Sequence, residues 1–173
     1  MTMPSALIET PAVIYETEND LPKNQRNELI NLMNQRLADA VDLQMQMKQA
    51  HWNVKGPNFI SLHLLFDQID DAVESYVDLI AERVVQLGGI AEGTVRMSAV
   101  RSRLVEYPLG ISEGPAHVEA VARALSTFAH EARNMIDEAD ELDDAVTADL
   151  FTEVARGVDK WLWFVESHSQ AQL

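Results

Sequence analysis

Apolar residues recur at intervals of three and four along most of the chain, which is the spacing of one face of an α-helix. The first run begins at Lys23 and continues to Gly56-Pro57, so it predicts a helix of about 30 residues, roughly 45 Å long. Asp20 is the predicted N-cap, and Pro22 suits the first turn. The apolar stripe steps by four residues and consists of Leu29, Met33, Leu37, Val41 and Met45.

A second helical run begins near Asn58 or Phe59 and ends at Gly88-Gly89, where two glycines stop it. Only a tight turn separates this run from the first, so the two helices are predicted to form an antiparallel hairpin. The apolar stripe of the second run consists of Ile60, Leu64, Leu65, Ile69, Val73, Val77, Ile80 and Val84.

Residues 90–114 interrupt the helical pattern with glycines and a proline, and they leave room for one short helix over residues 94–103. A third long helix follows from Gly114-Pro115 to about Glu141, and a fourth, with Thr147 as the predicted N-cap, ends near Ser167. The order of hairpin, long crossover and hairpin predicts an all-α four-helix bundle of ferritin-like topology, with a short helix in its single crossover. We expect residues 1–20 to form an N-terminal arm and residues 21–173 a single domain.

Charge and composition narrow the possible chemistry. The chain has 28 Asp and Glu against 13 Lys and Arg, a net charge of -15, so it attracts metal cations and repels polyphosphates. The absence of cysteine excludes disulfides, thiolate metal sites and cysteine nucleophiles, which leaves carboxylates and histidines as the metal ligands. Neither a signal peptide nor a membrane-spanning run is recognisable, so we expect a cytoplasmic protein without membrane contact.

The second helix carries an acidic row within an arc of about 120° of its surface. Taken alone, such a row is most often a solvated face. Two pairs in it have the four-residue spacing that lets neighbouring side chains hold one metal ion, and the hairpin brings His51 level with His63. The row consists of His63, Asp67, Asp70, Asp71, Glu74, Asp78 and Glu82.

The two pairs, His63 with Asp67 and Asp78 with Glu82, lie up to about 28 Å apart and cannot share a metal within one chain. They are, however, equally far from the middle of the helix, so an antiparallel crossing of two copies would bring them together. A two-fold dimer would then build two identical sites from both chains. Imidazole and carboxylate ligands suit iron, with zinc or manganese as competitors. No histidine has Glu three positions before it, which disfavours a di-iron site within one subunit.

One sequence block with its downstream spacing resembles a known family. The block is KQAHWNVKGPNF at residues 48–59, followed by Asp67, Asp78, AER at 81–83, QLGG at 86–89, YPL at 107–109 and DKWLWF at 159–164. Together these segments resemble the Dps family, or mini-ferritins, over about residues 20–167. The resemblance implies a hollow homo-dodecamer with ferroxidase centres between subunits. Such a protein oxidises Fe(II) with hydrogen peroxide or oxygen, stores the ferric mineral and protects against oxidative damage.

Carried onto this chain, the resemblance implies that iron is bound by five residues, where zinc can take its place. These ligands are His51, His63, Asp67, Asp78 and Glu82. Trp52, next to His51, is either a packed aromatic residue or a group near the metals that intercepts stray oxidising equivalents. Asp70 and Glu74 are candidates for facing the interior of the dodecamer and nucleating the mineral there. The remaining histidines, His117, His130 and His168, are interpreted as structural or exposed.

A second acidic cluster is explained either by solvation and helix N-terminal charge or, from the resemblance, by a three-fold channel for Fe(II) entry. The candidate channel residues are Asp144, Asp149 and Glu153. Two other functions remain open: a nucleoid protein that compacts DNA, and a non-catalytic helical assembly. Residues 1–20 and the tail after Glu166 contain no Lys or Arg, so we expect no appreciable DNA binding unless divalent cations bridge to the phosphates.

Overall fold

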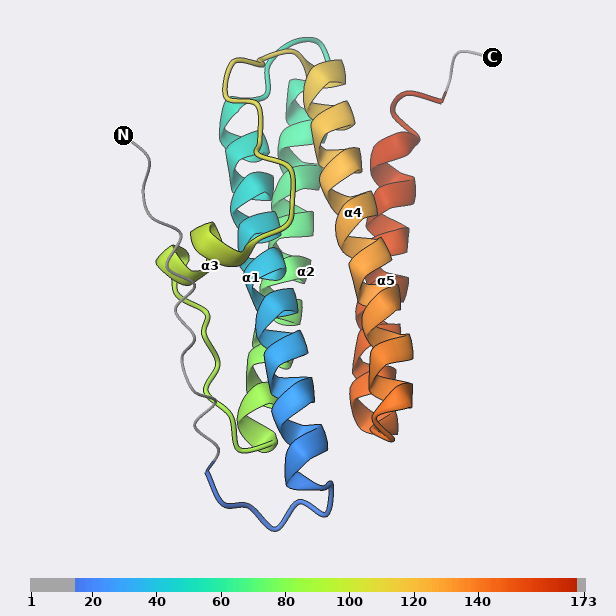
Figure 1. The fold of residues 1–173 in the computed structure, drawn as a ribbon. Helices are drawn as coiled ribbons and strands as arrows, with labels where there is room; N and C mark the ends of the chain where they lie inside the picture. The colour runs from blue at the N-terminus through green and yellow to red at the C-terminus, as the bar shows by residue number, and fades with distance from the viewer. Residues whose placement is uncertain (1–14, 171–173) are drawn as a thin grey trace.

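The computed structural model describes residues 15–170, which form five helices and, in that part of the chain, no strand. The four long helices make a bundle, and the short helix lies in the crossover beside the first of them (Figure 1). This arrangement confirms the predicted all-α bundle with one long crossover. The helices are α1 (Lys23–Asn53), α2 (Phe59–Gln86), α3 (Val95–Arg101), α4 (Gly114–Glu141) and α5 (Ala145–Glu166).

The two hairpins, α1 with α2 and α4 with α5, are joined by a crossover that runs along α1 (Figure 1). The α1–α2 turn and the start of α4 therefore lie at the same end of the bundle. There the backbone N–H of Lys55 donates to the carbonyl of Ser112 at 2.8 Å. Gly56 turns the chain with a φ of +106°, a conformation that residues with a side chain rarely adopt.

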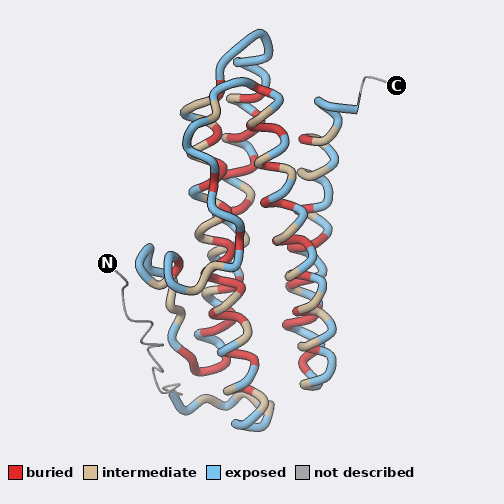
Figure 2. Tube along the Cα trace, turned by 45° about the horizontal axis from the view of Figure 1, so that its top comes forward, coloured by how far each residue is buried: buried red, intermediate tan, exposed pale blue. Residues whose placement is uncertain are grey.

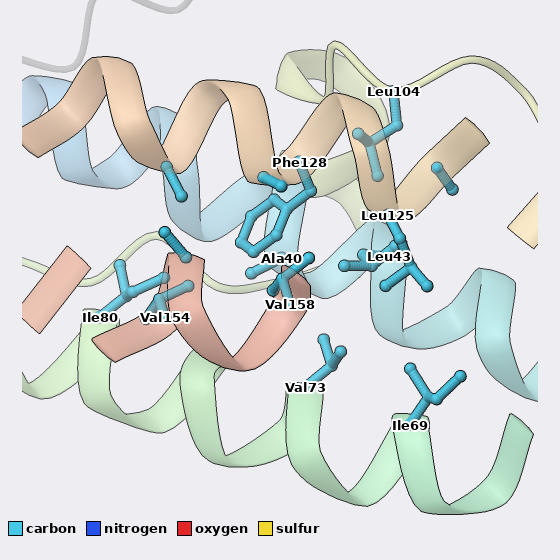
Figure 3. Packing of buried hydrophobic residues seen from close by; sticks show 14 of the residues in the cluster. Ala40, Leu43, Ile69, Val73, Ile80, Leu104, Leu125, Phe128, Val154 and Val158 are labelled. Atoms are coloured by element: carbon cyan, nitrogen blue, oxygen red, sulfur yellow. The ribbon is translucent and has the colours of Figure 1, made fainter. Parts of the chain in front are cut away.

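The core lies between the two hairpins, and the buried positions follow the inward faces of the long helices (Figure 2). Phe128 of α4 and Val158 of α5 meet Leu43 of α1, while Ile69 and Val73 of α2 close the layer from the other side (Figure 3). These five side chains are fully buried. Packing of apolar stripes, and not helix propensity alone, holds the bundle.

The predicted stripe of α1 is correct up to Val41, which is partly buried against the core, and wrong at Met45. Leu29, Met33 and Leu37 are fully buried, but the Met45 side chain is 46% exposed. Each step of four residues overshoots a helical turn by about 40°, so four steps turn a stripe by about 160°. The buried face therefore passes to Leu43, Met47 and Ala50.

Likewise, Ile60 and Leu64 at the start of α2 are exposed, although the pattern places them in the stripe. The later members Ile69, Val73 and Ile80 are fully buried. The first turns of α2 thus present apolar side chains outward from a single chain.

Helix starts differ from the predictions by a few residues. Pro22, and not Asp20, precedes α1, and no side chain caps that helix. Asp144, and not Thr147, caps α5, since its carboxylate accepts from the backbone N–H groups of Val146 and Thr147. Capping groups compete locally, and an aspartate already near the turn is a better acceptor than the later threonine.

Residues 15–20 of the predicted N-terminal arm have no helix or strand, and residues 1–14 lie outside the described part. No helix of the described part has the length and apolar character needed to cross a membrane.

Candidate metal centre

His51 and His63 face each other across the α1–α2 turn. The Nδ1 atom of each ring lies 2.8 Å from the backbone carbonyl oxygen of the other residue. The two rings stack with centroids 3.7 Å apart and planes inclined by 21°. The predicted alignment of the two histidines is therefore observed, and each ring holds the other in place.

This reciprocal contact determines which nitrogen of each histidine can bind a metal. A carbonyl oxygen only accepts hydrogen bonds, so Nδ1 of His51 and of His63 must carry the hydrogen. In the neutral ring the lone pair then belongs to Nε2. Histidine ligands usually donate their second ring N–H to a carbonyl or carboxylate in this way, which fixes the tautomer and ring orientation. The pair fits a metal site.

Asp67 lies one turn beyond His63 on α2, and its Oδ1 is 3.7 Å from Nδ1 of His51. The same oxygen is 2.6 Å from Nζ of Lys48, which also lies 2.8 Å from the buried carboxylate of Asp70. The hydrogen bond from Lys48 lowers the pKa of Asp67, although burial opposes this change. Asp67 is therefore a carboxylate anion held by a competing cation.

Sequence reasoning did not assign Lys48 a role at this site. A signal was present, because Lys48 lies one helical turn before His51 and so shares its side of α1. That spacing does not distinguish a cation at the ligand cluster from a cation in solvent. Only the packing of α1 against α2 brings Lys48 to Asp67.

Asp78 and Glu82, the other predicted ligands, are exposed on α2 and lie away from the histidines. Asp67 and Asp78 are eleven positions apart, about 16 Å along the helix. Among residues 15–170 of one chain, no three His, Asp or Glu side chains converge in a way that could hold a metal ion. One chain thus presents two parts of a ligand set at separate places on α2.

Trp52 is 61% exposed in the single chain, so packing within the chain does not account for it. It borders a groove between α1 and the crossover, together with Gln49 and Tyr107. His130 and His168 are exposed and His117 is buried, in line with their expected structural or exposed character.

The three candidate channel acids have different environments. Asp144 is buried, and both its oxygens accept hydrogen bonds from Arg83 of α2 at 2.9 Å. Burial raises the pKa of Asp144, but the hydrogen bonds from Thr147 and Arg83 lower it by more, and the result lies below its ordinary value. Asp149 and Glu153 are exposed on α5. Asp144 therefore joins α2 to the α4–α5 turn, and only the other two acids are free to meet solvent ions.

Comparison with known proteins matches this geometry to a family. Residues 30–171 match the family model described as a ferritin-like domain. A DNA protection during starvation protein from Agrobacterium fabrum is 42% identical over 156 residues, which cover 90% of this chain and 96% of that protein. The chain belongs to the Dps family.

Solved Dps structures have the same fold. DpsA14 from Streptomyces coelicolor superposes with a TM-score of 0.87 at 29% identity, covering 93% of this chain and 95% of that one. Dps from Mycobacterium smegmatis superposes with a TM-score of 0.86 at 28% identity, covering 91% and 95%. Membership of this ferritin-like family supports an iron-storage role of the mini-ferritin kind for this Dps chain.

Proposed function

We propose that this Dps protein is a ferroxidase that oxidises Fe(II) with hydrogen peroxide, or oxygen, at sites shared between subunits of a hollow dodecamer. His51, His63 and Asp67 of one chain and Asp78 and Glu82 of the partner subunit hold the iron. The observation that carries the proposal is the reciprocal histidine pair, which engages both Nδ1 atoms and leaves the Nε2 lone pairs for a metal ion. Asp67 lies next to this pair, with its Oδ1 3.7 Å from Nδ1 of His51.

The position of the ligands along α2 supports completion by a second copy. Asp67 and Asp78 are equally far from the middle of α2, near residues 72 and 73, as are His63 and Glu82. An antiparallel two-fold crossing at that point sets each incomplete group against its complement. A contact between subunits would also cover apolar side chains that are exposed near the α1–α2 turn. These are Trp52, Ile60, Leu64 and Leu109.

The chemistry follows from holding two substrate ions close together. Two Fe(II) each give one electron to one hydrogen peroxide, which yields two Fe(III) and two hydroxide ions without releasing a hydroxyl radical. His51 and His63 supply neutral ligands of fixed orientation, and Asp67 supplies negative charge that favours the higher oxidation state. Zinc, which prefers the same ligand types, competes for the site.

Iron entry and storage use the acidic surface. We propose that Asp149 and Glu153, exposed on α5, line the route by which Fe(II) enters the shell. Exposed Glu74 on α2 is a candidate for nucleating the ferric mineral inside, whereas Asp70 is buried. The net charge of -15 per chain concentrates cations around an assembly of many copies.

The test combines two inactive variants. We expect His51→Ala/His63→Ala and Asp78→Ala/Glu82→Ala each to assemble normally and to lose peroxide-driven Fe(II) oxidation, measured anaerobically by ferric absorbance. Asp137→Ala, which removes an exposed carboxylate from α4, is the matched control and retains activity.

Coassembly of the two inactive variants then decides whether the site is shared. Each mixed dimer has one site with all five ligands and one that keeps only Asp67, so random mixing restores about a quarter of the wild-type sites. Restored activity supports a shared site, and normal activity in either variant alone rejects the assignment. If mixed particles remain inactive, the ligands do not come from two chains.

A further inference from the structure

The hydroxyl of Tyr107 and the ring of His117 form a buried hydrogen bond at the end of the bundle that carries His51 and His63. Tyr107 lies in the crossover and His117 in the first turn of α4, and the Tyr107 Oη to His117 Nδ1 distance is 2.6 Å. His117 is fully buried and Tyr107 is 7% exposed. Neither residue belongs to the proposed metal site.

Both partners are neutral. Burial raises the pKa of Tyr107, so its phenol stays protonated. Burial, and to a smaller extent Lys55, lowers the pKa of His117, so its ring stays unprotonated at neutral pH. The phenol therefore donates to Nδ1, and the ring hydrogen is on Nε2.

The pair lies beside the metal-binding end of α1 and α2. Tyr107 borders the same groove as Trp52, the residue after His51. Gln46 of α1 donates to the carbonyl of Val105 at 3.1 Å, which holds this part of the crossover against the turns that lead to His51.

Aromatic packing also reaches the pair from α2. The His117 ring centroid is 6.5 Å from that of Phe66, which lies one turn beyond His63. Leu62, the neighbour of His63, packs so closely on Gly114 that a Cβ there would lie 2.8 Å from its Cδ1 atom. The start of α4, and with it His117, is thus in direct contact with the histidine-bearing turn of α2.

We propose that Tyr107, with His117 as its proton acceptor, is a one-electron relay that quenches oxidising radicals formed when Fe(II) meets peroxide outside the paired reaction. This inference rests on the proposed function, because the oxidant arises there. A phenol is oxidised far more readily when its proton can move at once to a base within hydrogen-bond reach. His117 is such a base, and both partners of the hydrogen bond are buried.

The step balances as follows. A hydroxyl radical takes one electron and becomes hydroxide, while Tyr107 loses that electron and its phenolic proton moves to Nδ1 of His117. The products are a neutral tyrosyl radical and an imidazolium ion. One further Fe(II) then supplies an electron, the proton returns to the phenol oxygen, and Fe(III) is formed. Each turn of the relay consumes one radical and one Fe(II).

The experiment uses whole particles loaded with Fe(II) without air, mixed with excess peroxide and freeze-quenched for electron paramagnetic resonance. We expect a tyrosyl signal, assigned with ring-deuterated tyrosine, in wild type and in the control Tyr15→Phe/Tyr76→Phe, which changes the other two tyrosines. Tyr107→Phe is expected to lose it. His117→Gln keeps a hydrogen-bond acceptor but no base, and it is expected to lose the signal although Tyr107 is present.

Ferric absorbance of the same samples separates the two proposals. If iron is oxidised but wild type shows no tyrosyl signal, or the signal survives in Tyr107→Phe or His117→Gln, the relay is overturned and the ferroxidase assignment stands. If iron is not oxidised, the ferroxidase assignment fails, and iron-free particles treated with a photochemical one-electron oxidant decide the relay. A radical there that requires both Tyr107 and His117 supports it, and the absence of that radical overturns it.

Discussion

The ammonium group of Lys48 lies 2.6 Å from Oδ1 of Asp67, so a cation of the protein occupies the carboxylate that the proposed site needs for iron. Lys48 also contacts Oδ2 of Asp70 at 2.8 Å, and Oδ1 of Asp70 has no hydrogen-bond partner in the described part of the chain. Asp70 can therefore retain the ammonium group when Asp67 turns to a metal ion.

Removing this competition is expected to tighten metal binding. An ion pair with partly exposed members contributes about 1 kcal/mol, so Lys48→Met is expected to raise the affinity for Fe(II) or Zn(II) about fivefold. Titration calorimetry under anaerobic conditions measures the change, with Lys160→Met, an exposed lysine on α5, as the control. Weaker binding by Lys48→Met would mean that Lys48 supports the site and does not compete with metal.

Two ion pairs of similar chemistry are expected to differ in their effect on stability because their burial differs. Arg83 and Asp144 are both buried, whereas Arg133 and Asp159 are about half exposed. Asp144→Ala leaves the Arg83 charge buried without a partner and removes the α5 cap, so we expect a loss of about 3–5 kcal/mol in unfolding free energy. Asp159→Ala is expected to cost below about 1 kcal/mol. Denaturant unfolding measures both, and equal losses would contradict this account.

Stability is expected to depend on pH through His117. Because burial, and then Lys55, lowers the His117 pKa below its ordinary value of 6.5, the folded chain binds fewer protons than the unfolded chain as pH falls below 6.5. This contribution to stability is complete above that pH and is lost below it, by at most about 1.4 kcal/mol per pH unit.

The matched comparison is between His117→Gln and His168→Gln, the second of which changes an exposed histidine. Unfolding free energies measured from pH 7.5 to 5.0, a range set by the ordinary histidine pKa of about 6.5, are expected to lose part of their slope only in His117→Gln. A slope identical to wild type in that variant would show that His117 takes up its proton equally in both states.

DNA binding is expected to be negligible without divalent cations. Affinity for DNA comes mainly from Lys and Arg that replace phosphate counterions, and residues 1–20 contain neither. In a low-salt gel shift with EDTA we expect no complex, while Glu9→Lys/Glu16→Lys/Glu18→Lys is expected to gain one. A tight complex of the wild-type protein in EDTA would contradict the prediction, and a complex that appears only with magnesium would identify bridging cations.

Much of the fold could be predicted because helix formation depends on local spacing. The ends of α1 and α2 agree with the prediction to within a few residues, because Gly56 and Gly88 take positive φ values just after them. Met45 shows the limit of this reasoning. Its four-residue spacing is compatible with the stripe, yet accumulated helical rotation turns it into solvent, and only the position of the neighbouring helices defines the buried face.

The candidate site, like the fold, could be predicted from the sequence only in part. The equal heights of His51 and His63 follow from their distances to the turn, so sequence was sufficient to pair them. The exchange of backbone carbonyls between them was not predictable, because it depends on ring orientation. Spacing along the chain also did not show which of the candidate channel acids are exposed. Asp144 caps α5 and accepts hydrogen bonds from Arg83, and the second contact exists only because α2 packs on the α4–α5 turn.

The amino-acid sequence by itself determined the helices, the single crossover, the anionic character and the ligand types, because each depends on composition or on neighbours within a turn or two. The tertiary structure alone decided the contacts of Lys48 with Asp67, of Arg83 with Asp144 and of Tyr107 with His117. All three contacts join different elements, and the first also spans the α1–α2 turn. Such contacts require a particular rotation and depth of one helix against its neighbour, which is set by the fit of many core side chains together.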